Sequence, residues 1–465
     1  MKLYNSLTRR KEEFVPVVEG QVRMYTCGPT VYNYIHVGNA RPMVVFDTLR
    51  RFFIYRGYDV KYVVNFTDID DKIINRAKEE KTSFKEIAER YIEAFLEDAK
   101  GLNLLEDKTI HPRATEFIKP MIDFIEKLIE MGAAYNVDGN VYFNVEAAKD
   151  YGKLSKKNID ELISGARVEV NDEKKNPMDF ALWKKAKEGE PYWESPWGKG
   201  RPGWHIECSV MARTLLGDTI DIHAGGEDLQ FPHHENEIAQ SETLTGKPFA
   251  NYWLHNAMIN IDNQKMSKSL GNFLLVKDVR KEFDLEVLRF FLLSAHYRTP
   301  INFTRDIMKQ MENALERLYN GKKNMEYLLD KCIDRPLNAE EENHLQKIEG
   351  FKQDFIESME DDLNTADAIA SLFELVKYTN INLNENTSKI LVAKSYEKLM
   401  ELANVLGILC KEDEILEDEI LELIEKRTEA RKNKNYKLAD EIRDKLRERG
   451  IILEDTQEGV KWKRI

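Results

Sequence analysis

The stretch that decides the fold runs from Val22 to Val64. It comprises Val22-Arg23-Met24-Tyr25-Thr26, a Gly/Pro loop, an apolar-periodic stretch from Gly38 to Phe53, and Val60-Lys61-Tyr62-Val63-Val64. The two short apolar runs predict buried strands, and the periodic stretch predicts a helix between them. Strand, helix and strand within about forty residues form the βαβ unit of a doubly wound parallel sheet. Ligands bind such sheets where the strands end, so we expect one pocket to contain Cys27, the loop at His36 and the run Asn65-Phe66-Thr67-Asp68.

An insertion is expected to interrupt this sheet. Residues 116–132 have a helical pattern, Val141-Tyr142-Phe143-Asn144-Val145 has the pattern of a strand, and the tract from about 150 to 202 is rich in turn residues and lysine. The sheet resumes near Thr219-Ile220-Asp221-Ile222-His223. We expect a helix that begins at Pro232 to follow, and then the strand Tyr252-Trp253-Leu254-His255.

The rest of the chain predicts helices. From about 305 to 425 the pattern is helical throughout, which is typical of a helix bundle, and the last forty or so residues predict a small separate α+β module. The expected domains are two halves of an α/β sheet domain, residues 1–115 and 203–304, an insertion at 116–202, a bundle at 305–425 and a terminal module at 426–465.

Composition describes a soluble globular protein. The 465 residues exceed what one hydrophobic core usually supports, and no run approaches the roughly 18 apolar residues of a membrane span. The first residues lack the apolar core of a secretory signal, so we expect a cytoplasmic protein without membrane contact. Four scattered cysteines suit reduced thiols or metal ligands better than a disulfide framework. We expect Cys332 and Cys410 to be small buried hydrophobic residues.

Charge is distributed unevenly along the chain. The net charge is −13, but residues 426–449 contain ten Lys and Arg against five Asp and Glu. A basic terminus suggests a phosphate-bearing partner. A solvated helix face explains the charge count equally well.

Four side chains form a candidate metal site. His233 and Glu237 are four residues apart on a predicted helix and can reach the same ion, while Cys27 and Cys208 would add two thiolates. Thiolates favour zinc over hard cations. The alternative is a pair of core cysteines and a His/Glu pair on a helix surface. A zinc ion here could be structural, or catalytic with room for a substrate sulfur.

Two loops suggest nucleotide binding. Gly38 opens a predicted helix, so its backbone N–H groups and the helix dipole favour phosphate, and His36 can donate hydrogen bonds to phosphoryl oxygens. A helix-capping loop is the alternative. The segment Lys265-Met266-Ser267-Lys268-Ser269-Leu270-Gly271-Asn272 carries two ammonium groups that can neutralise a pyrophosphate leaving group. The chain has no GxxxxGK[ST] loop.

These motifs together resemble the class I aminoacyl-tRNA synthetases, and among them the cysteinyl-tRNA synthetase family. The resemblance runs almost end to end. Besides the two loops, it rests on Cys27-Gly28-Pro29-Thr30-Val31-Tyr32, Thr67-Asp68-Ile69-Asp70-Asp71-Lys72-Ile73-Ile74, Asn176-Pro177-Met178-Asp179-Phe180, Gly203-Trp204-His205-Ile206-Glu207-Cys208 and Phe231-Pro232-His233-His234-Glu235-Asn236-Glu237.

The resemblance implies a Rossmann-type catalytic domain with a connective insertion, a helical bundle and a C-terminal anticodon-binding module. It implies ATP-dependent activation of L-cysteine and its transfer to the 3′ end of tRNA(Cys), with Mg-ATP as substrate, and we expect a monomer. It also implies one zinc ion per chain, whose role is to hold the substrate thiolate. Serine differs from cysteine by one atom, and a metal that prefers sulfur rejects it without an editing site.

The resemblance also assigns residues. The zinc ligands would be Cys27, Cys208, His233 and Glu237. The catalytic residues would be His36, Asn39, Lys265 and Lys268, and ATP would contact Gly38 and Lys268. The substrate cysteine would contact Gly28, Thr67, Asp68 and Trp204. Ordinary core packing is the alternative for Trp204. Asn39 stands where the family signature commonly has a second histidine; it can donate a hydrogen bond but cannot carry positive charge.

We expect Arg431, Asp440 and Trp462 to read the anticodon, because Arg can meet base edges and Trp can stack. Each could instead be a surface charge or part of the core of the terminal module. The enzymatic rival is a ligase that passes cysteine to an amino sugar, as in mycothiol synthesis, but such ligases lack the terminal module. A non-catalytic tRNA- or zinc-binding relative should lack the lysine loop or His36, and both are present.

Overall fold

The structure is a computed structural model that describes residues 1–465 except 158–172, 267–272, 412–417, 449–450, 457–458 and 465. Its centre is a five-stranded sheet with the order β11-β10-β3-β4-β5, in which every neighbouring pair is parallel. The predicted parallel α/β sheet is therefore confirmed. Its strands are β3 (Gln21–Thr26), β4 (Asp59–Val64), β5 (Thr109–Ile110), β10 (Ile220–Gly226) and β11 (Ala250–Asn256).

Helix α1 (Val37–Tyr55) connects β3 to β4 and confirms the βαβ unit. The strand order reverses at β3, because β4 lies on one side of it and the much later β10 on the other. Such a switch point opens a crevice at the carboxyl ends of the strands. All seven residues of β10 are buried, as expected for a parallel sheet that is covered on both faces.

Further helices and two small sheets complete this domain. The small sheets have the orders β1-β2 and β13-β12-β14. The helices are α2 (Asp71–Glu80), α3 (Phe84–Gly101), α6 (Trp204–Leu216), α7 (Glu235–Thr245), α8 (Val276–Val279) and α9 (Leu285–Leu293), and the strands are β1 (Lys2–Asn5), β2 (Arg10–Glu13), β12 (Ile259–Ile261), β13 (Gln264–Lys265) and β14 (Ile301–Phe303).

The helix expected to begin at Pro232 is confirmed. Within the helical turn Gln230–His234 only Phe231 is non-helical, with φ −142° and ψ 133°, so the helical backbone that leads into α7 begins at Pro232.

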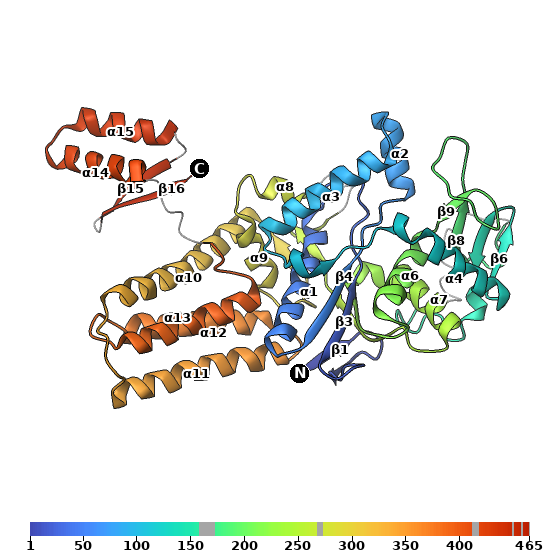
Figure 1. Ribbon diagram of the computed structural model, residues 1–465, viewed down its shortest axis with the longest axis horizontal. Coiled ribbons are helices and arrows are strands. Elements are labelled where there is room, and N and C mark those ends of the chain that lie inside the picture. Colours follow the sequence, from blue (N-terminus) through green and yellow to red (C-terminus); the bar gives the residue numbers. More distant parts are fainter. Residues whose placement is uncertain (158–172, 267–272, 412–417, 449–450, 457–458, 465) are drawn as a thin grey trace. The chain divides into compact units, whose positions relative to one another are not determined.

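The insertion has its own antiparallel sheet, β6-β7-β8-β9, which lies beside α4, α6 and α7 (Figure 1). Helix α4 and strand β7 confirm the helix and strand expected there. A separate hydrophobic core that contains Trp183 holds this part together. The elements are α4 (Ile118–Glu130), β6 (Ala134–Val137), β7 (Asn140–Phe143), β8 (Phe180–Lys185) and β9 (Gly200–Pro202).

The predicted bundle is present as α10 (Arg305–Lys331), α11 (Ala339–Glu360), α12 (Thr365–Asn382) and α13 (Lys389–Leu406). Its core is continuous with that of the sheet domain, and both belong to one compact unit, Met1–Leu409. No helix in the described part of the chain is both long and apolar enough to cross a membrane.

A second compact unit, Cys410–Ile465, contains α14 (Asp418–Lys432), α15 (Tyr436–Glu448) and a hairpin of β15 (Ile451–Thr456) and β16 (Gly459–Arg464). The sequence predicts the boundary between residues 425 and 426, where the charge changes sign. The units divide between Leu409 and Cys410 instead, and α14 runs across Lys426. A change of surface charge does not interrupt a helix, so it is a poor marker of a boundary.

The prediction of buried positions for Cys332 and Cys410 is wrong. Cys332 is half-buried and Cys410 is exposed. Cys332 caps the end of α10 and packs only partly against the main core, and Cys410 follows the last residue of the first compact unit.

Candidate metal and substrate site

Four chain segments converge at the switch point of the sheet. Cys27 follows β3, Cys208 lies on α6, and His233 and Glu237 flank the start of α7. Helices α6 and α7 pack against each other, and β10 pairs with β3. The fold therefore brings together all four side chains that the sequence nominates as metal ligands.

One ligand atom from each of the four lies within 4.8 Å of the others, and all four residues are buried. Cys27 Sγ is 3.7 Å from Cys208 Sγ, Cys208 Sγ is 3.6 Å from His233 Nε2, and His233 Nε2 is 3.0 Å from Glu237 Oε1. Two thiols, an imidazole and a carboxylate form a donor set that suits tetrahedral zinc. We call these four residues the metal cluster.

Two further histidines that sequence reasoning missed reach the same place. His223 and His234, together with Cys27 and Glu237, form a second buried quartet whose ligand atoms also lie within 4.8 Å of one another. His223 Nε2 lies 2.8 Å from Glu237 Oε2, and His234 Nε2 lies 3.3 Å from Cys27 Sγ. The sequence offered one signal for each histidine. His223 lies in the alternating pattern of β10, and His234 directly follows His233. Glu237 thus faces two imidazoles, one from each of its oxygens.

Residues outside the cluster hold its rings in place. His205 Nδ1 lies 3.0 Å from His233 Nδ1, and the ring of Trp204 stacks on His233 with centroids 4.1 Å apart and an interplanar angle of 19°. His234 Nδ1 lies 2.9 Å from His255 Nε2. Such outer contacts fix the orientation of metal-binding imidazoles. Because Trp204 is 38% exposed, ordinary core packing does not explain it.

The charges in the cluster are strongly coupled. Burial raises the pKa of the Cys27 thiol well above its usual value, and the hydrogen bond with Cys208 adds to this. Burial would also raise the pKa of Cys208, but hydrogen bonds with Cys27 and His233 outweigh it and lower that pKa to about 6. Burial opposes charge on His233, yet the Glu237 carboxylate raises the pKa of that imidazole to about 10. The hydrogen bonds and charges within the cluster thus outweigh the effect of burial at Cys208 and at His233.

A chain of hydrogen bonds ties the two cysteine-bearing segments together. Asn65 Oδ1 accepts from the backbone N–H of Gly28 at 2.9 Å and lies 3.8 Å from Cys208 Sγ. Asn65 Nδ2 donates to Thr67 Oγ1 at 3.4 Å, and Thr67 Oγ1 donates to Glu207 Oε2 at 2.7 Å. Sequence reasoning placed Asn65 at the strand end but gave no role to its side chain.

Neighbouring residues fix the positions of Gly28 and Asp68, which the sequence nominates for substrate binding. A Cβ at position 28 would lie 1.7 Å from the carbonyl oxygen of Asn65, so no other residue fits there. The two oxygens of Asp68 accept hydrogen bonds from the backbone N–H and the hydroxyl of Thr115, at 2.9 and 2.5 Å. Burial raises the pKa of Asp68.

The loop before α1 is both a helix cap and a candidate phosphate site. His36 Nδ1 accepts from the backbone N–H of Asn39 at 3.2 Å, and Asn39 Oδ1 accepts from the backbone N–H of His36 at 3.3 Å. This capping box explains why position 39 carries a neutral amide side chain. A Cβ on Gly38 would lie 2.9 Å from His36 Nδ1 and from Met266 Cε, so the helix start packs against the residue after Lys265.

The remaining nominated residues lie elsewhere. Lys265 ends β13 and is exposed, whereas Lys268 lies outside the described residues. Arg431 is exposed in the last turn of α14, and Asp440, on α15, forms an ion pair with Arg443 at 3.1 Å. Trp462 lies in β16 opposite Leu453.

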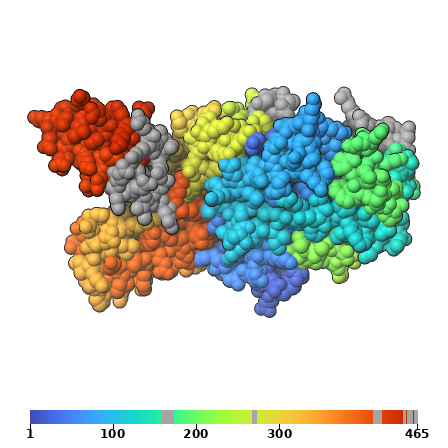
Figure 2. Space-filling model, turned by 45° about the horizontal axis from the view of Figure 1, so that its top comes forward, coloured from blue at the N-terminus to red at the C-terminus, as the bar shows by residue number. Residues whose placement is uncertain are grey.

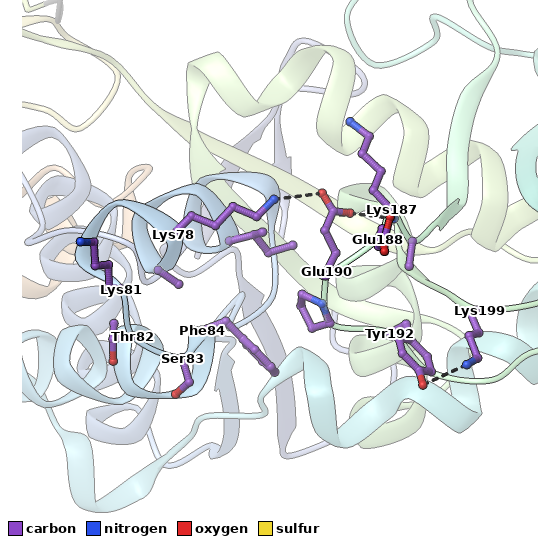
Figure 3. A pocket seen from close by; sticks show the side chains of 15 residues that line it. Lys78, Lys81, Thr82, Ser83, Phe84, Lys187, Glu188, Glu190, Tyr192 and Lys199 are labelled. Carbon is purple, nitrogen blue, oxygen red and sulfur yellow. Dashed lines mark hydrogen bonds and ion pairs between the residues drawn. The ribbon is translucent and has the colours of Figure 1, made fainter.

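Two of the cavities that border the insertion lie against α2. One, of about 400 Å³, opens beside Trp204 and His205. The other, of about 720 Å³, lies between the α2–α3 turn and the segment that connects β8 to β9, which lie side by side on one face (Figures 2 and 3). In this larger cavity Lys78 pairs with Glu190 at 3.6 Å and Lys199 donates to the Tyr192 hydroxyl at 3.0 Å. None of its lining residues belongs to the metal cluster.

Comparison with known families accounts for most of the chain. The family description "tRNA synthetases class I (C) catalytic domain" matches residues 13–313, "DALR domain" matches 354–410, and "Cysteinyl-tRNA ligase anticodon binding domain" matches 413–462. The chain is 63% identical over 466 residues to "Cysteine--tRNA ligase" of Finegoldia magna and 56% identical over 466 residues to that of Clostridioides difficile. Each alignment covers 100% of both chains.

Solved structures share the fold. Methionyl-tRNA synthetase of Mycobacterium tuberculosis aligns with a TM-score of 0.57 at 15% identity over 83% of this chain and 89% of that one. The leucyl enzyme in the Agrobacterium radiobacter ternary complex aligns with a TM-score of 0.62 at 11% identity over 85% of each chain. At such identities the likeness supports the fold alone.

Proposed function

The chain belongs to the cysteine--tRNA ligases, a family of class I aminoacyl-tRNA synthetases, and we propose that it activates L-cysteine with Mg-ATP and transfers it to the 3′ end of tRNA(Cys). One observation carries the proposal. A buried cluster of two thiols, an imidazole and a carboxylate lies at the switch point of a parallel sheet, where this fold binds its substrates.

We assign one zinc ion per chain to Cys27, Cys208, His233 and Glu237, whose donor atoms fit it. When bound there, zinc supplies a soft Lewis acid that accepts a thiolate and discriminates against the hydroxyl of serine. Trp204 and His205 support His233 from outside, so the ring keeps its orientation when the amino acid arrives. Gly28, Thr67, Asp68 and Trp204 would form the walls around the amino acid.

The first half-reaction forms a new P–O bond and breaks another. An oxygen of the cysteine carboxylate attacks the α-phosphorus of ATP, and the bridging oxygen leaves with its electron pair as pyrophosphate. His36 and the backbone N–H groups at Gly38, at the start of α1, would donate hydrogen bonds to the phosphates. Lys265 and Lys268 would neutralise charge on the leaving pyrophosphate. Asn39 would contribute by capping the helix that presents these groups.

In the second half-reaction a hydroxyl of the terminal ribose attacks the carbonyl carbon of the adenylate. The ester bond to tRNA forms, the bond to phosphate breaks, and AMP leaves while the hydroxyl proton passes to solvent. Arg431, Asp440 and Trp462 of the second compact unit would contact the anticodon. The match to an anticodon-binding domain over residues 413–462 favours tRNA over an amino sugar as the acceptor.

We further place the enzyme in the cytoplasm as a monomer. Its described cysteines are free thiols, and a reducing compartment would keep the pair at the cluster available for metal.

Cysteine-dependent ATP–pyrophosphate exchange tests the proposal. The zinc-loaded full chain should exchange rapidly with cysteine and at least about a hundred-fold more slowly with serine. Removing zinc with a chelator should abolish exchange with cysteine, and adding zinc back should restore it. Equal exchange with serine, or full activity in protein shown to be metal-free, would refute the assignment.

A further inference from the structure

One face of α2 carries two charged side chains two turns apart. Asp71 is the first residue of the helix and Lys78 comes seven residues later, so both lie on the same face. The insertion presents the opposite charges to them. Arg201, in β9, bonds to Asp71, and Glu190, on the segment that connects β8 to β9, pairs with Lys78 at 3.6 Å (Figure 3).

The four side chains form a row of alternating charge, which we call the charge ladder. Arg201 Nη2 lies 3.9 Å from Glu190 Oε2, so the order is Asp71, Arg201, Glu190 and Lys78. The side chains of the two middle members, Arg201 and Glu190, are only 5% and 6% exposed. Removing a charged group from water is costly unless the group has a partner. The insertion therefore meets α2 in the arrangement that pairs both buried charges.

A second cation of the insertion also holds Asp71. Lys184, on β8, donates a hydrogen bond to its carboxylate at 2.8 Å. Burial opposes the charged form of Asp71, but the bonds with Lys184 and Arg201 outweigh burial and lower the pKa of that carboxyl. Hydrogen bonds between charged groups are short and directional. Asp71 thus fixes the start of α2 against β8 and β9.

The pair of Asp71 and Arg201 joins two segments that lead to the amino-acid site. Asp71 follows Asp68 by three residues, and Arg201 precedes Trp204 by three residues. Asp68 and Trp204 are both proposed walls of that site. The ion pair therefore ties together the two segments from which these walls extend.

The backbone between Arg201 and Trp204 has little freedom. The N–H of Gly203 donates to the carbonyl oxygen of Leu182 at 2.8 Å, and a Cβ at position 203 would lie 2.0 Å from the carbonyl oxygen of Ala181. Only glycine fits at so close an approach. A shift of Arg201 would therefore be passed on to the start of α6 and to Trp204.

Apolar packing defines this junction less narrowly. Ile69 and Ile74, on either side of the start of α2, share a hydrophobic core with Leu182 of β8 and Ile206 of α6. Hydrophobic burial is non-directional, so it holds these parts together while directional bonds set their orientation. The larger cavity lies at the same junction, so the packing between α2 and the segment that connects β8 to β9 is incomplete.

We propose that Arg201 and Asp71 are positioning residues for the amino-acid site, and that the charge ladder sets the place of Trp204 beside the substrate. Neither residue belongs to the metal cluster or to the loop at His36, so each acts through the segment that it anchors. The inference rests on the proposed function, in which Trp204 forms a wall around cysteine. Loss of the ladder should weaken cysteine binding and leave the zinc ligands and the phosphate contacts in place.

Steady-state ATP–pyrophosphate exchange tests the proposal. Arg201→Met, Arg201→Lys, Asp71→Asn and the double variant of Arg201→Met with Asp71→Asn are prepared as zinc-loaded full chains. Arg201→Met and Asp71→Asn should each raise the KM for cysteine by about ten-fold. Their kcat and their KM for ATP should stay within about two-fold of the original protein, with one zinc ion per chain. Arg201→Lys keeps the charge and should return the KM for cysteine to within about three-fold.

The double variant shows whether the two residues act as a pair. Its KM for cysteine should stay close to that of the worse single variant, because the second substitution removes a contact that is already lost. Independent effects would instead multiply to about a hundred-fold.

Lys185 supplies a matched control. It follows Lys184 in β8 and pairs with Asp138 at 2.9 Å, so Lys185→Ala removes an ion pair that lies wholly within the insertion. This variant should match the original protein in KM and kcat. If Arg201→Met does not fold, Asp71→Asn and Glu190→Gln, which keep the shapes of their side chains, decide the question. We expect Glu190→Gln to raise the KM for cysteine by about three-fold at nearly constant kcat.

Four results would overturn the inference. These are an unchanged KM for cysteine in Asp71→Asn, a fall in kcat alone as a purely structural role would produce, effects that multiply in the double variant, and an equal rise in KM in Lys185→Ala. By contrast, an original protein that fails to exchange with cysteine would contradict the proposed function itself. The two failures are therefore distinguishable.

Discussion

Cys27 Sγ lies 3.7 Å from Cys208 Sγ, although 181 residues separate them in the sequence. Cys27 directly follows β3 at the switch point, and Cys208 lies in the second turn of α6, so the distance between them depends on how the two halves of the sheet domain pack together. The Asn65 side chain spans the same gap, because its oxygen faces both Gly28 and Cys208. The metal cluster is thus assembled by tertiary packing and held by one amide.

Replacing a cluster thiol should abolish metal binding. Cys208→Ser removes a thiolate whose pKa is lowered to about 6, and a serine hydroxyl does not ionise near neutral pH. We expect zinc affinity to fall by at least about a hundred-fold, measured by metal analysis after equilibrium dialysis. Cys332→Ser, at a half-buried thiol outside the cluster, is the control and should keep one zinc ion per chain. A Cys208→Ser protein that retains zinc would contradict the ligand assignment.

Removing the Asn65 amide should weaken the metal site without removing a ligand. Asn65→Ala breaks the hydrogen bonds with Gly28 and Thr67, so both thiol-bearing segments lose their link. Outer contacts of this kind typically change metal affinity by about 10- to 100-fold. Zinc release to a chromogenic chelator should therefore accelerate by about that factor. Unchanged release would show that packing alone holds the thiols together.

We expect the imidazole of His36 to contribute to the rate of adenylate formation and not to the binding of cysteine. His36→Ala removes a donor to the phosphates, and loss of one such donor typically costs about 10²–10³ in rate. We expect kcat for ATP–pyrophosphate exchange to fall by that factor while the KM for cysteine stays nearly constant. His36→Asn, which can still cap α1 as Asn residues do elsewhere, controls for loss of the cap. If the asparagine variant regained full rate, helix capping would explain the whole effect of position 36.

Asp98 should make the stability of the protein depend on pH. It is 1% exposed, neither of its oxygens has a hydrogen-bond partner among the described residues, and burial raises its pKa to about 6, although Arg280 opposes the shift. The unfolded carboxyl titrates near 4. Between about pH 4 and 6 the folded chain therefore binds more protons than the unfolded chain, so its stability falls as pH rises through that window.

Asp98→Asn removes this charge and should therefore stabilise the protein by about 1–3 kcal/mol at pH 7, with little gain at pH 4. Urea unfolding at both pH values measures the difference. Asp107→Asn, at an exposed aspartate on the surface, is the matched control and should show no such pH-dependent gain. Equal stabilisation at both pH values would rule out the titration of Asp98 as its cause.

Local patterns made the central predictions possible. Alternating or continuous apolar residues identified β3 and β4, and helical periodicity identified α1, because these signals come from neighbours a few residues apart. The four cluster residues could be nominated together because each lies in a recognisable motif. Sequence reasoning failed where the signal was indirect. The charge reversal at Lys426 falls inside α14, Cys332 at the end of α10 is only half-buried, and Cys410 is exposed.

The sequence by itself determined the βαβ unit, the helical region and the types of ligand atoms, because periodicity and side-chain chemistry are properties of short segments. Only the tertiary structure decided that His223 and His234 share Cys27 and Glu237, that Asn65 joins the two thiol segments, and that Trp204 stacks on His233. These contacts depend on strand order and on how α6 meets α7. Residues more than a hundred positions apart are brought together by burial of the sheet, which no local pattern encodes.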